Sequence, residues 1–233
     1  MDTNITLHRP IPLHVYTCWH TKDLPQAMQQ NYDWMVDHNE EMTFHLYDES
    51  ECREFIAKNF NPDVVHAYDS LIPCSYKSDL WRFCMLYTNG GVYVDIKYRC
   101  VPTFRLVELT WKEHFVRDIF DACVYTALIV TRPKNEVMKL CIQQIVHNVT
   151  TQFYGRHALD PTGPGLLGRW FTEEERKQLS IFHRVHMTNR IVRQVVGKKV
   201  LLEDYPEYKD EQNLYQKKKY YAEFWEDRTI YAT

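Results

Sequence analysis

One block of sequence, residues 75–97, limits the fold more than any other part of the chain. Within it, four apolar residues recur at i, i+3, i+4 and i+7, the spacing of a helix with a buried stripe: Leu80, Phe83, Cys84 and Tyr87. Asn89-Gly90-Gly91 follows and predicts the left-handed stop of that helix. The apolar run Val92–Asp95 then predicts a buried strand.

The flanking segments continue this alternation of strand and helix. Before the block we predict strands over 12–18 and 43–48, and helices over 26–38 and 51–60, the second helix capped by Asp48 or Ser50. After it we predict a strand over 122–131, a helix over 135–148, a short helix ending at Trp170 and a hairpin over 181–202. The tail from Tyr205 to Thr233 has no clear periodicity. Such alternation is typical of an α/β domain with a mostly parallel central sheet.

Length and composition exclude several classes of protein. The 233 residues favour one domain spanning 1–233, because two independent domains would each be small. A formal charge of -3 gives no basic footprint for general nucleic-acid binding. No apolar run is long enough to span a bilayer, and the seven scattered cysteines suggest reduced thiols rather than a disulfide framework or a zinc site.

Asp95 is the first candidate for chemistry. It stands at the predicted carboxyl end of a strand, which is where open α/β sheets hold their ligands. Asp79 and Arg82 lie three residues apart on the preceding helix and share one edge of it, with Lys77 at the helix start. A lone Asp there would more often only end the strand, but charges rarely gather on a buried helix edge without a polar ligand.

These residues carry a resemblance. Ser78-Asp-Leu-Trp-Arg82 followed by Leu86-Tyr-Thr-Asn-Gly-Gly-Val-Tyr-Val-Asp95 resembles the central motif of family 32 glycosyltransferases, the group with Och1-like mannosyltransferases and DXD sugar-binding proteins of capsule synthesis. The opening Ile11–Trp19 is similar to the first strand of that family, and Thr162-Gly-Pro-Gly165 to its Thr-Gly-Pro loop. The resemblance covers about residues 11 to 170.

The resemblance implies a single GT-A domain, a Rossmann-like fold that binds a UDP- or GDP-sugar mainly through residues 11–100. Residues 101–233 would then supply the side that faces a glycan or glycoprotein acceptor. The implied activity is that of a retaining hexosyltransferase acting in polysaccharide or glycoprotein glycan synthesis. The implied donor-binding residues are Thr17 and Trp19 at the nucleotide, Asp79 and Arg82 at the sugar and diphosphate, Lys77, and Gly90 and Gly91, which would clear space.

The sequence departs from the family at the second position of its DXD motif. Asp95 is the first Asp, but Lys97 stands where the second Asp, the usual metal ligand, would be. The implied Mn²⁺ or Mg²⁺ site is therefore weakened. Lys97 would either contact the donor diphosphate directly, or point outward and leave Asp95 to bind a metal with water and phosphate oxygens. The family's C-terminal metal-binding His is not evident either, since no histidine follows His186.

Asp160, in the run His157-Ala-Leu-Asp-Pro-Thr-Gly163, is the candidate carboxylate nearest the reacting centre. It would act as a nucleophile in a double displacement, or orient the acceptor and stabilise charge in a front-face reaction. The competing interpretation is an Asp-Pro turn. Lys217-Lys-Lys219 is interpreted as a solvated face rather than a phosphate clamp.

Two other classes of function remain open at this stage. A degenerate transferase would bind a nucleotide sugar without turnover, and a plain interaction domain would bind no nucleotide. About ten residues precede the first strand, which favours a soluble cytoplasmic enzyme of bacterial or large-virus type, or a piece trimmed from a longer protein. The sequence does not identify the sugar, the acceptor or the oligomeric state.

Overall fold

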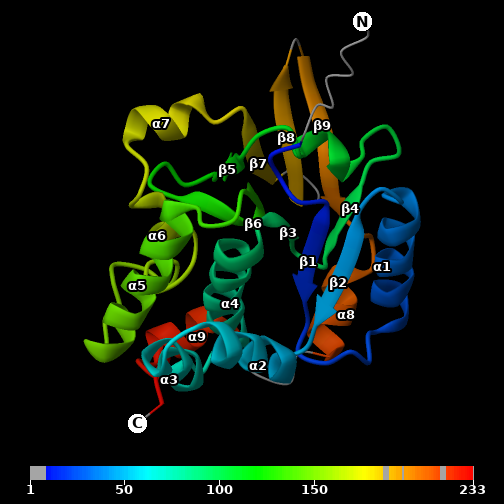
Figure 1. The fold of residues 1–233 in the computed structure, drawn as a ribbon. Coiled ribbons are helices and arrows are strands. Elements are labelled where there is room, and N and C mark those ends of the chain that lie inside the picture. The colour runs from blue at the N-terminus through cyan, green and yellow to red at the C-terminus, as the bar shows by residue number, and fades with distance from the viewer. Residues whose placement is uncertain (1–8, 186–188, 196, 216–218, 233) are drawn as a thin grey trace, which may run out of the picture.

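The computed structural model of the protein describes residues 9–185, 189–195, 197–215 and 219–232. Figure 1 shows a central sheet with helices packed around it. Of the sequence features named above, His186, Lys217 and Lys218 lie outside the described residues. Lys219 is described, and it forms an exposed ion pair with Asp227.

The N-terminal part alternates strand and helix as predicted. Its elements are β1 (His14–Cys18), α1 (Gln26–His38), β2 (Thr43–Tyr47) and α2 (Glu49–Asn59). Asp48, rather than Ser50, caps α2: its carboxylate accepts from the Glu51 N–H, and the Glu51 carboxylate accepts from the Asp48 N–H. The helical crossovers leave β1 parallel to both β2 and β3 (Gly91–Val94).

Two helices lie between α2 and β3. Helix α3 (Pro62–Ser70) was not predicted, although Asn61 at its N-cap and Pro62 at its first position are ordinary start signals. Helix α4 (Cys74–Asn89) follows, and residues 79–86 within it are all buried. The apolar stripe seen in the sequence is therefore part of a helix that is enclosed on nearly every side.

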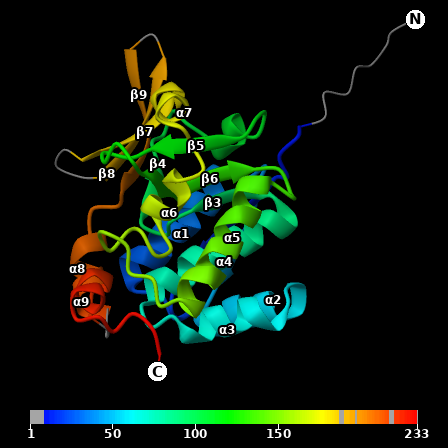
Figure 2. The same ribbon diagram turned by 90° about the vertical axis from the view of Figure 1, so that its left-hand side faces the viewer.

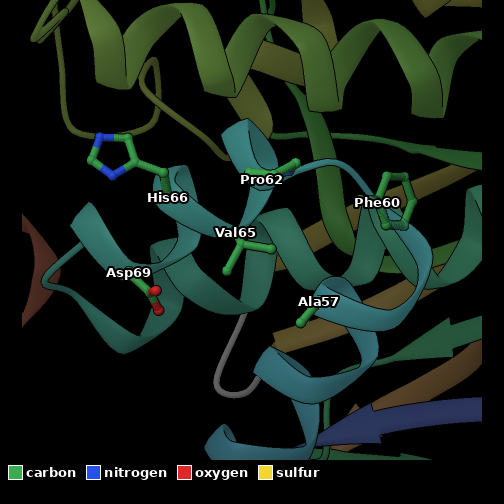
Figure 3. A pocket seen from close by; sticks show the side chains of 6 residues that line it. All are labelled: Ala57, Phe60, Pro62, Val65, His66 and Asp69. Carbon is green, nitrogen blue, oxygen red and sulfur yellow. The ribbon is translucent and has the colours of Figure 1, made fainter.

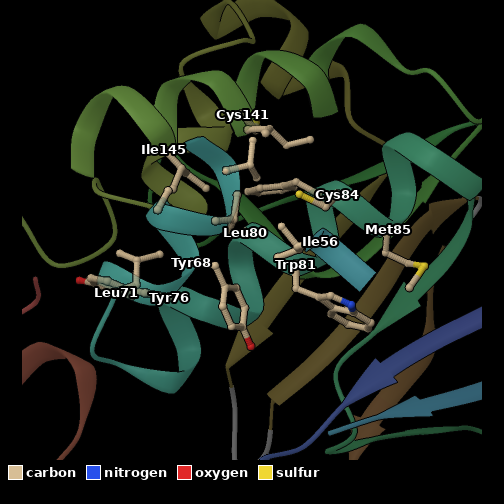
Figure 4. Packing of buried hydrophobic residues seen from close by; sticks show 14 of the residues in the cluster. Ile56, Tyr68, Leu71, Tyr76, Leu80, Trp81, Cys84, Met85, Cys141 and Ile145 are labelled. Carbon is tan, nitrogen blue, oxygen red and sulfur yellow. The ribbon is translucent and has the colours of Figure 1, made fainter. Parts of the chain in front are cut away.

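Helix α4 is the centre of the largest of three hydrophobic clusters among the described residues (Figure 4). Leu80 and Trp81 are fully buried there against helices on three sides. The partners include Ile56 from α2, Tyr68 from α3, and Cys141 and Ile145 from α5 (Glu136–Thr150). The second cluster occupies the other face of the sheet, since Val92 and Val94 of β3 belong to it whereas Tyr93 belongs to the first.

The remaining elements are mostly short. They are β4 (Tyr98–Cys100), the 3-10 helix η1 (Leu106–Leu109), β5 (His114–Arg117), β6 (Val124–Thr131), α6 (Pro164–Gly168), α7 (Glu173–Gln178), β7 (Ile181–Val185), β8 (Asn189–Val195), β9 (Gly197–Asp204), α8 (Tyr208–Tyr215) and α9 (Tyr221–Glu226). The predicted hairpin over 181–202 is thus a three-stranded meander. The tail, which showed no periodicity, contains two helices.

The prediction of a mostly parallel sheet was wrong. The described residues form a nine-stranded sheet in the order β2-β1-β3-β6-β5-β7-β8-β9-β4. Only the β1–β2, β1–β3 and β5–β7 pairs are parallel. The other pairs are antiparallel, because β5–β6 and the β7–β9 meander turn back directly instead of crossing over through a helix.

The sheet curls, and this curl positions the candidate site. Strands β3 and β4 are joined by only residues 95–97, yet β3 pairs with β6 while β4 pairs with β9 at the far end of the strand order. In both ribbon views β8 and β9 rise at the end of the molecule opposite α2 and α3 (Figures 1 and 2). Asp95 and Lys97 therefore lie in the connection between the two halves of the sheet.

Helix α8, which follows β9, packs beside α1 (Figure 1). Helix α1 has no side-chain cap of its own, and the Glu211 carboxylate of α8 accepts from the Ala27 and Met28 N–H groups at its start. The Tyr205 hydroxyl also donates to Glu211. A negative charge at a helix N-terminus is favourable, so this contact stabilises the packing of α8 against the start of α1.

Candidate functional site

Asp95 follows β3 directly, at the carboxyl end of the strand. Its backbone N–H donates to the Ala127 carbonyl of β6 at 2.9 Å, and its own carbonyl accepts from the Tyr98 N–H at 3.0 Å. The side chain is 26% exposed. Its backbone is thus held on both sides while the carboxylate keeps an open edge.

Three groups surround the Asp95 carboxylate. The Tyr93 hydroxyl donates to Oδ1 at 2.8 Å, and Arg82 Nη1 lies 3.4 Å from the same oxygen. Lys97 Nζ lies 3.6 Å from Oδ2. Burial alone would raise the pKa of Asp95, but the positive charges of Arg82 and Lys97 lower it below the ordinary value. Asp95 is therefore ionised at neutral pH.

Arg82 connects the helix α4 to this strand end. Its guanidinium donates to the Thr126 carbonyl at 2.8 Å and to the Ser78 hydroxyl at 2.9 Å. It also lies over the Tyr93 ring, 4.3 Å from the centroid, and forms an ion pair with Asp79 at 3.3 Å. Because its side chain is only 7% exposed, Arg82 supports Asp95 from the protein interior and presents little surface to a ligand.

Asp79 lies behind Arg82 and holds the loop that precedes α6. The Thr162 hydroxyl donates to Asp79 Oδ2 at 2.9 Å, and a Cβ on Gly163 would come within 3.0 Å of that oxygen. Desolvation raises the pKa of Asp79 to about 6, although Arg82 and Thr162 oppose the shift. A buried carboxylate with so perturbed a pKa costs stability, and such groups are concentrated at functional sites.

The raised pKa of Asp79 predicts a specific pH dependence of stability. The free energy of unfolding should fall as pH rises from 3.8, the ordinary value, to about 6, because the native state binds the proton more tightly than the unfolded chain. Relative to Asp79→Asn, the free energy of unfolding of wild type should fall by about 1 to 3 kcal/mol across this window and should not fall further above it. Urea denaturation of both proteins between pH 4 and 8 measures the difference. A constant difference across that range would contradict the assignment.

Lys97 points into the site. Its ammonium donates to the Tyr125 hydroxyl at 3.1 Å and lies 3.6 Å from Asp95, and its side chain is 17% exposed. Burial alone would lower the pKa of Lys97, but the oxygens of Tyr125 and Asp95 raise it above the ordinary lysine value. Of the two orientations considered from the sequence, the structure has the inward one, with a permanently charged ammonium beside Asp95.

The donor set around Asp95 does not fit a divalent metal ion. Among the described residues, no three His, Cys, Asp or Glu side chains are grouped so that they could hold one. The single carboxylate of Asp95 already has Arg82 and Lys97 as cationic partners. A third cation there would be repelled by both, so these residues do not form a divalent-metal site.

Thr17 and Trp19 lie at and just beyond the carboxyl end of β1, which is parallel to β3 and ends at the same edge. Thr17 Oγ1 and Trp19 Nε1 are buried without a hydrogen-bond partner in the described structure. The Trp19 ring packs against a small apolar cluster that contains Met28, Ile96 and Tyr205. The two unpaired groups give this end of the site unused capacity for hydrogen bonds.

The structure does not bring Lys77 to Asp95. Its ammonium donates to Glu49 of α2 at 2.7 Å and lies over the Tyr68 ring. Gly90 and Gly91, proposed from the sequence to clear space for the donor, lie against the protein's own backbone. A Cβ at either position would strike protein backbone, Pro133 at Gly90 and the His14 carbonyl at Gly91, and both residues have positive φ. These glycines let the chain turn and let β3 approach β1 at the strand end away from Asp95.

Asp160 stabilises its own loop. Its Oδ2 accepts from the Arg156 N–H at 2.8 Å, and its Oδ1 lies 3.6 Å from His157. A Cβ on Gly155 or Gly165 would collide with the carboxylate, so the loop closes tightly around it. This geometry favours the turn interpretation over a nucleophile, which would need an open face.

Several residues of the site were not identified from the sequence. They are Tyr125 of β6, His183 of β7 and Asp204 of β9. Only the fold places Tyr125 against Lys97, His183 against Tyr125, and the charge of Asp204 near the ammonium. The surface hollow drawn in Figure 3 lies away from these residues, between α2 and α3. It is lined by Ala57, Phe60, Pro62, Val65, His66 and Asp69.

Comparison with known proteins adds independent findings. Residues 25–115 match the family described as "Glycosyltransferase sugar-binding region containing DXD motif". This part of the chain is therefore similar to a sugar-binding region of glycosyltransferases. The match includes α4, Asp95 and Lys97, but ends before Tyr125 and Asp160.

Curated relatives are similar at low identity. Inositol phosphoceramide mannosyltransferase 3 of Schizosaccharomyces pombe is 28% identical over 93 residues, 40% of this chain and 26% of that protein. Inositol phosphoceramide mannosyltransferase 2 of the same organism is 25% identical over 138 residues, 59% of this chain and 39% of that protein. The matches therefore span well under half the length of these relatives.

A solved structure shares the fold. The PaToxG glycosyltransferase superposes with a TM-score of 0.53 at 16% identity, covering 68% of this chain and 67% of the other. This supports a mixed α/β glycosyltransferase fold of GT-A type, with the antiparallel strands described above. Within the described part of the chain, none of the helices combines the length and the apolar character needed to cross a bilayer.

Proposed function

We propose that this chain is a glycosyltransferase that moves a sugar from a UDP- or GDP-sugar to a glycan or glycoprotein acceptor. The observation that carries the proposal is the position of Asp95 at the end of β3, with Arg82 beneath it and the Lys97 ammonium beside it. The match of residues 25–115 to a sugar-binding region supports it. Polysaccharide or glycoprotein glycan synthesis is the corresponding biological role.

The proposed roles follow from charge. When the glycosidic bond of the donor breaks, negative charge grows on the leaving diphosphate, and the Lys97 ammonium is placed to stabilise it. Asp95, ionised and partly open, orients a sugar hydroxyl and stabilises the positive charge that develops on the sugar ring. Asp79 and Arg82 act from below by holding Asp95 and the Thr162 loop. Thr17 and Trp19 would bind the nucleotide.

We propose retention of configuration without a covalent intermediate on Asp160. The bond from the anomeric carbon to the diphosphate oxygen breaks, and both electrons stay on that oxygen. The acceptor hydroxyl oxygen then bonds the anomeric carbon from the same face, and its proton passes to the leaving diphosphate. The enclosed carboxylate of Asp160, already paired within its loop, is consistent with a supporting role there.

Donor hydrolysis tests the proposed function without knowledge of the acceptor. We expect the wild-type protein to release UDP or GDP from at least one member of a panel that includes UDP-glucose and GDP-mannose. The alternative, a module that binds nucleotide sugar without turnover, is favoured by the replacement of the second Asp by Lys97. It predicts calorimetric binding of UDP or GDP with no product. An interaction domain predicts neither.

Lys97 predicts an unusual response to metal removal. Because the ammonium already supplies positive charge at Asp95, wild type should keep most of its donor hydrolysis in EDTA. Lys97→Asp should lose activity by about 100-fold in EDTA and recover part of it with Mn²⁺, since a second carboxylate restores a hard-cation site. Lys139→Asp, at an exposed position on α5, is the control and should behave like wild type. Complete loss of wild-type activity in EDTA, restored by Mn²⁺, would contradict this role.

A further inference from the structure

The Lys97 ammonium is held by a phenol that lies outside the matched sugar-binding region. Tyr125 of β6 accepts from Lys97 Nζ at 3.1 Å, and a second phenol, that of Tyr98, lies 3.0 Å from the Tyr125 oxygen. An ammonium has three N–H donors. One is bound by Tyr125 and a second faces Asp95 at 3.6 Å, which leaves a third for a further acceptor.

Tyr125 is itself fixed by His183 of β7. The two rings are stacked, with centroids 3.9 Å apart and an interplanar angle of 2°. His183 is only 8% exposed, and a buried ring packed flat against a second ring permits little rotation of either. The orientation of the Tyr125 hydroxyl is thus determined by a strand that has no direct contact with Asp95 among the described interactions.

His183 is in turn held at one of its nitrogens. Nε2 lies 3.3 Å from Asn189 Oδ1, whereas Nδ1, which lies 3.7 Å from the buried Asp118 carboxylate, has no hydrogen-bond partner among the described residues. The Asn189 amide also donates to Asp204, whose negative charge faces Lys97. A series of polar contacts therefore runs from His183 of β7 through Asn189 of β8 to Asp204 of β9, and the charge of Asp204 acts on the ammonium through space.

We propose that Tyr125 and His183 are positioning residues that hold the Lys97 ammonium toward the donor diphosphate. This rests on the proposed function for its chemistry, while the geometry rests on the contacts described above. A lysine side chain has four rotatable bonds, so an unheld ammonium would sample many positions. Strands β6 and β7 thus supply the groups that hold the lysine found at the second DXD position in one orientation.

The positioning can be measured without any substrate. The ammonium protons of a hydrogen-bonded, shielded lysine exchange slowly enough to give a ¹H–¹⁵N correlation, and Lys97→Met assigns that signal. We expect the signal in wild type and its loss in Tyr125→Phe and His183→Ala. Tyr98→Phe is the matched control: it removes a buried hydroxyl from the same group of phenols but not the one that touches Lys97, and it should keep the signal. Survival of the signal in Tyr125→Phe would overturn the proposal.

Donor hydrolysis then tests the consequence. Tyr125→Phe should lower kcat by about 10-fold with little change in KM, the effect of one hydrogen bond that acts on the leaving group. In the Lys97→Met variant, Tyr125→Phe should lower kcat less than about two-fold, because Tyr125 acts through Lys97. An equal loss in both backgrounds would overturn the positioning role. If wild type neither binds nor hydrolyses any donor, the proposed function fails, and the ammonium signal still decides the positioning of Lys97.

Discussion

Replacing Asp95 by Asn is expected to reduce donor hydrolysis by about 100- to 1,000-fold, the range seen when one electrostatic contact to a transition state is removed. Asn is nearly the same size as Asp, so the fold should survive, but the charge that faces the developing positive sugar is lost. Because Lys97 and Arg82 would then have no anion between them, their ammonium and guanidinium would also repel each other. Steady-state release of UDP or GDP at saturating donor measures the loss.

The control for this variant is Asp69→Asn. Asp69 forms an exposed ion pair with Arg53 on the helices α2 and α3, and its side chain is 41% exposed. Its replacement should leave hydrolysis within two-fold of wild type, as surface ion pairs contribute little. If Asp95→Asn turns over donor at the wild-type rate, Asp95 does not belong to the reacting site.

Removing the Arg82 charge is expected to have the largest effect on stability. Arg82→Met leaves the buried Asp79 without its cation and leaves the Thr126 carbonyl without its donor. Breaking one partner out of a buried ion pair costs about 3 to 5 kcal/mol of unfolding free energy. Urea denaturation at pH 7.5 measures this loss directly.

Arg53→Met is the matched control, because it removes the same charge from an ion pair that is 48% exposed on the arginine side. It should lower the free energy of unfolding much less than Arg82→Met does, because an exposed ion pair is screened by solvent. Equal losses of unfolding free energy in the two variants would show that the contacts of Arg82 contribute no more to stability than a surface ion pair does. Below pH 6, Arg82→Met should lose less unfolding free energy, since Asp79 then takes up a proton and no longer needs a cationic partner.

Local sequence signals predicted the part of the site that lies close together in the chain. The spacing of Asp79 and Arg82 on one helix, the glycine stop and the strand that ends at Asp95 are all encoded within residues 75–97. Short-range geometry alone brings these side chains together, because α4 and β3 are joined directly through Gly90. The bounds of α1 were predicted for the same reason, since its start and end depend on adjacent residues.

The direction of Lys97 could not be predicted in this way. It depends on Tyr125, which is 28 residues away, and on a curl of the sheet that brings β9 to β4. Such contacts follow from strand pairing, which hydrophobic periodicity does not specify. The mostly parallel sheet was predicted from the alternation of the first elements, and it was wrong because the later strands turn back without helical crossovers.

The glycines illustrate a different limit. Gly90 and Gly91 have the residue type expected both for close approach of a ligand and for close approach of the chain to itself. The structure shows the second, with the His14 carbonyl 2.7 Å from where a Cβ of Gly91 would stand. Asp160 is similar, because the same Asp-Pro sequence suits a catalytic carboxylate and a turn that closes on Gly155 and Gly165.

The most direct test of the central claim is isothermal titration of the wild-type protein and Lys97→Met with UDP, GDP and the corresponding nucleosides. If Lys97 faces a donor diphosphate, wild type should bind UDP or GDP at least 10-fold more tightly than the matching nucleoside, and Lys97→Met should lose most of that difference. Binding of nucleoside and diphosphate with equal affinity, or no binding of either, would contradict a nucleotide-sugar site built around Asp95 and Lys97.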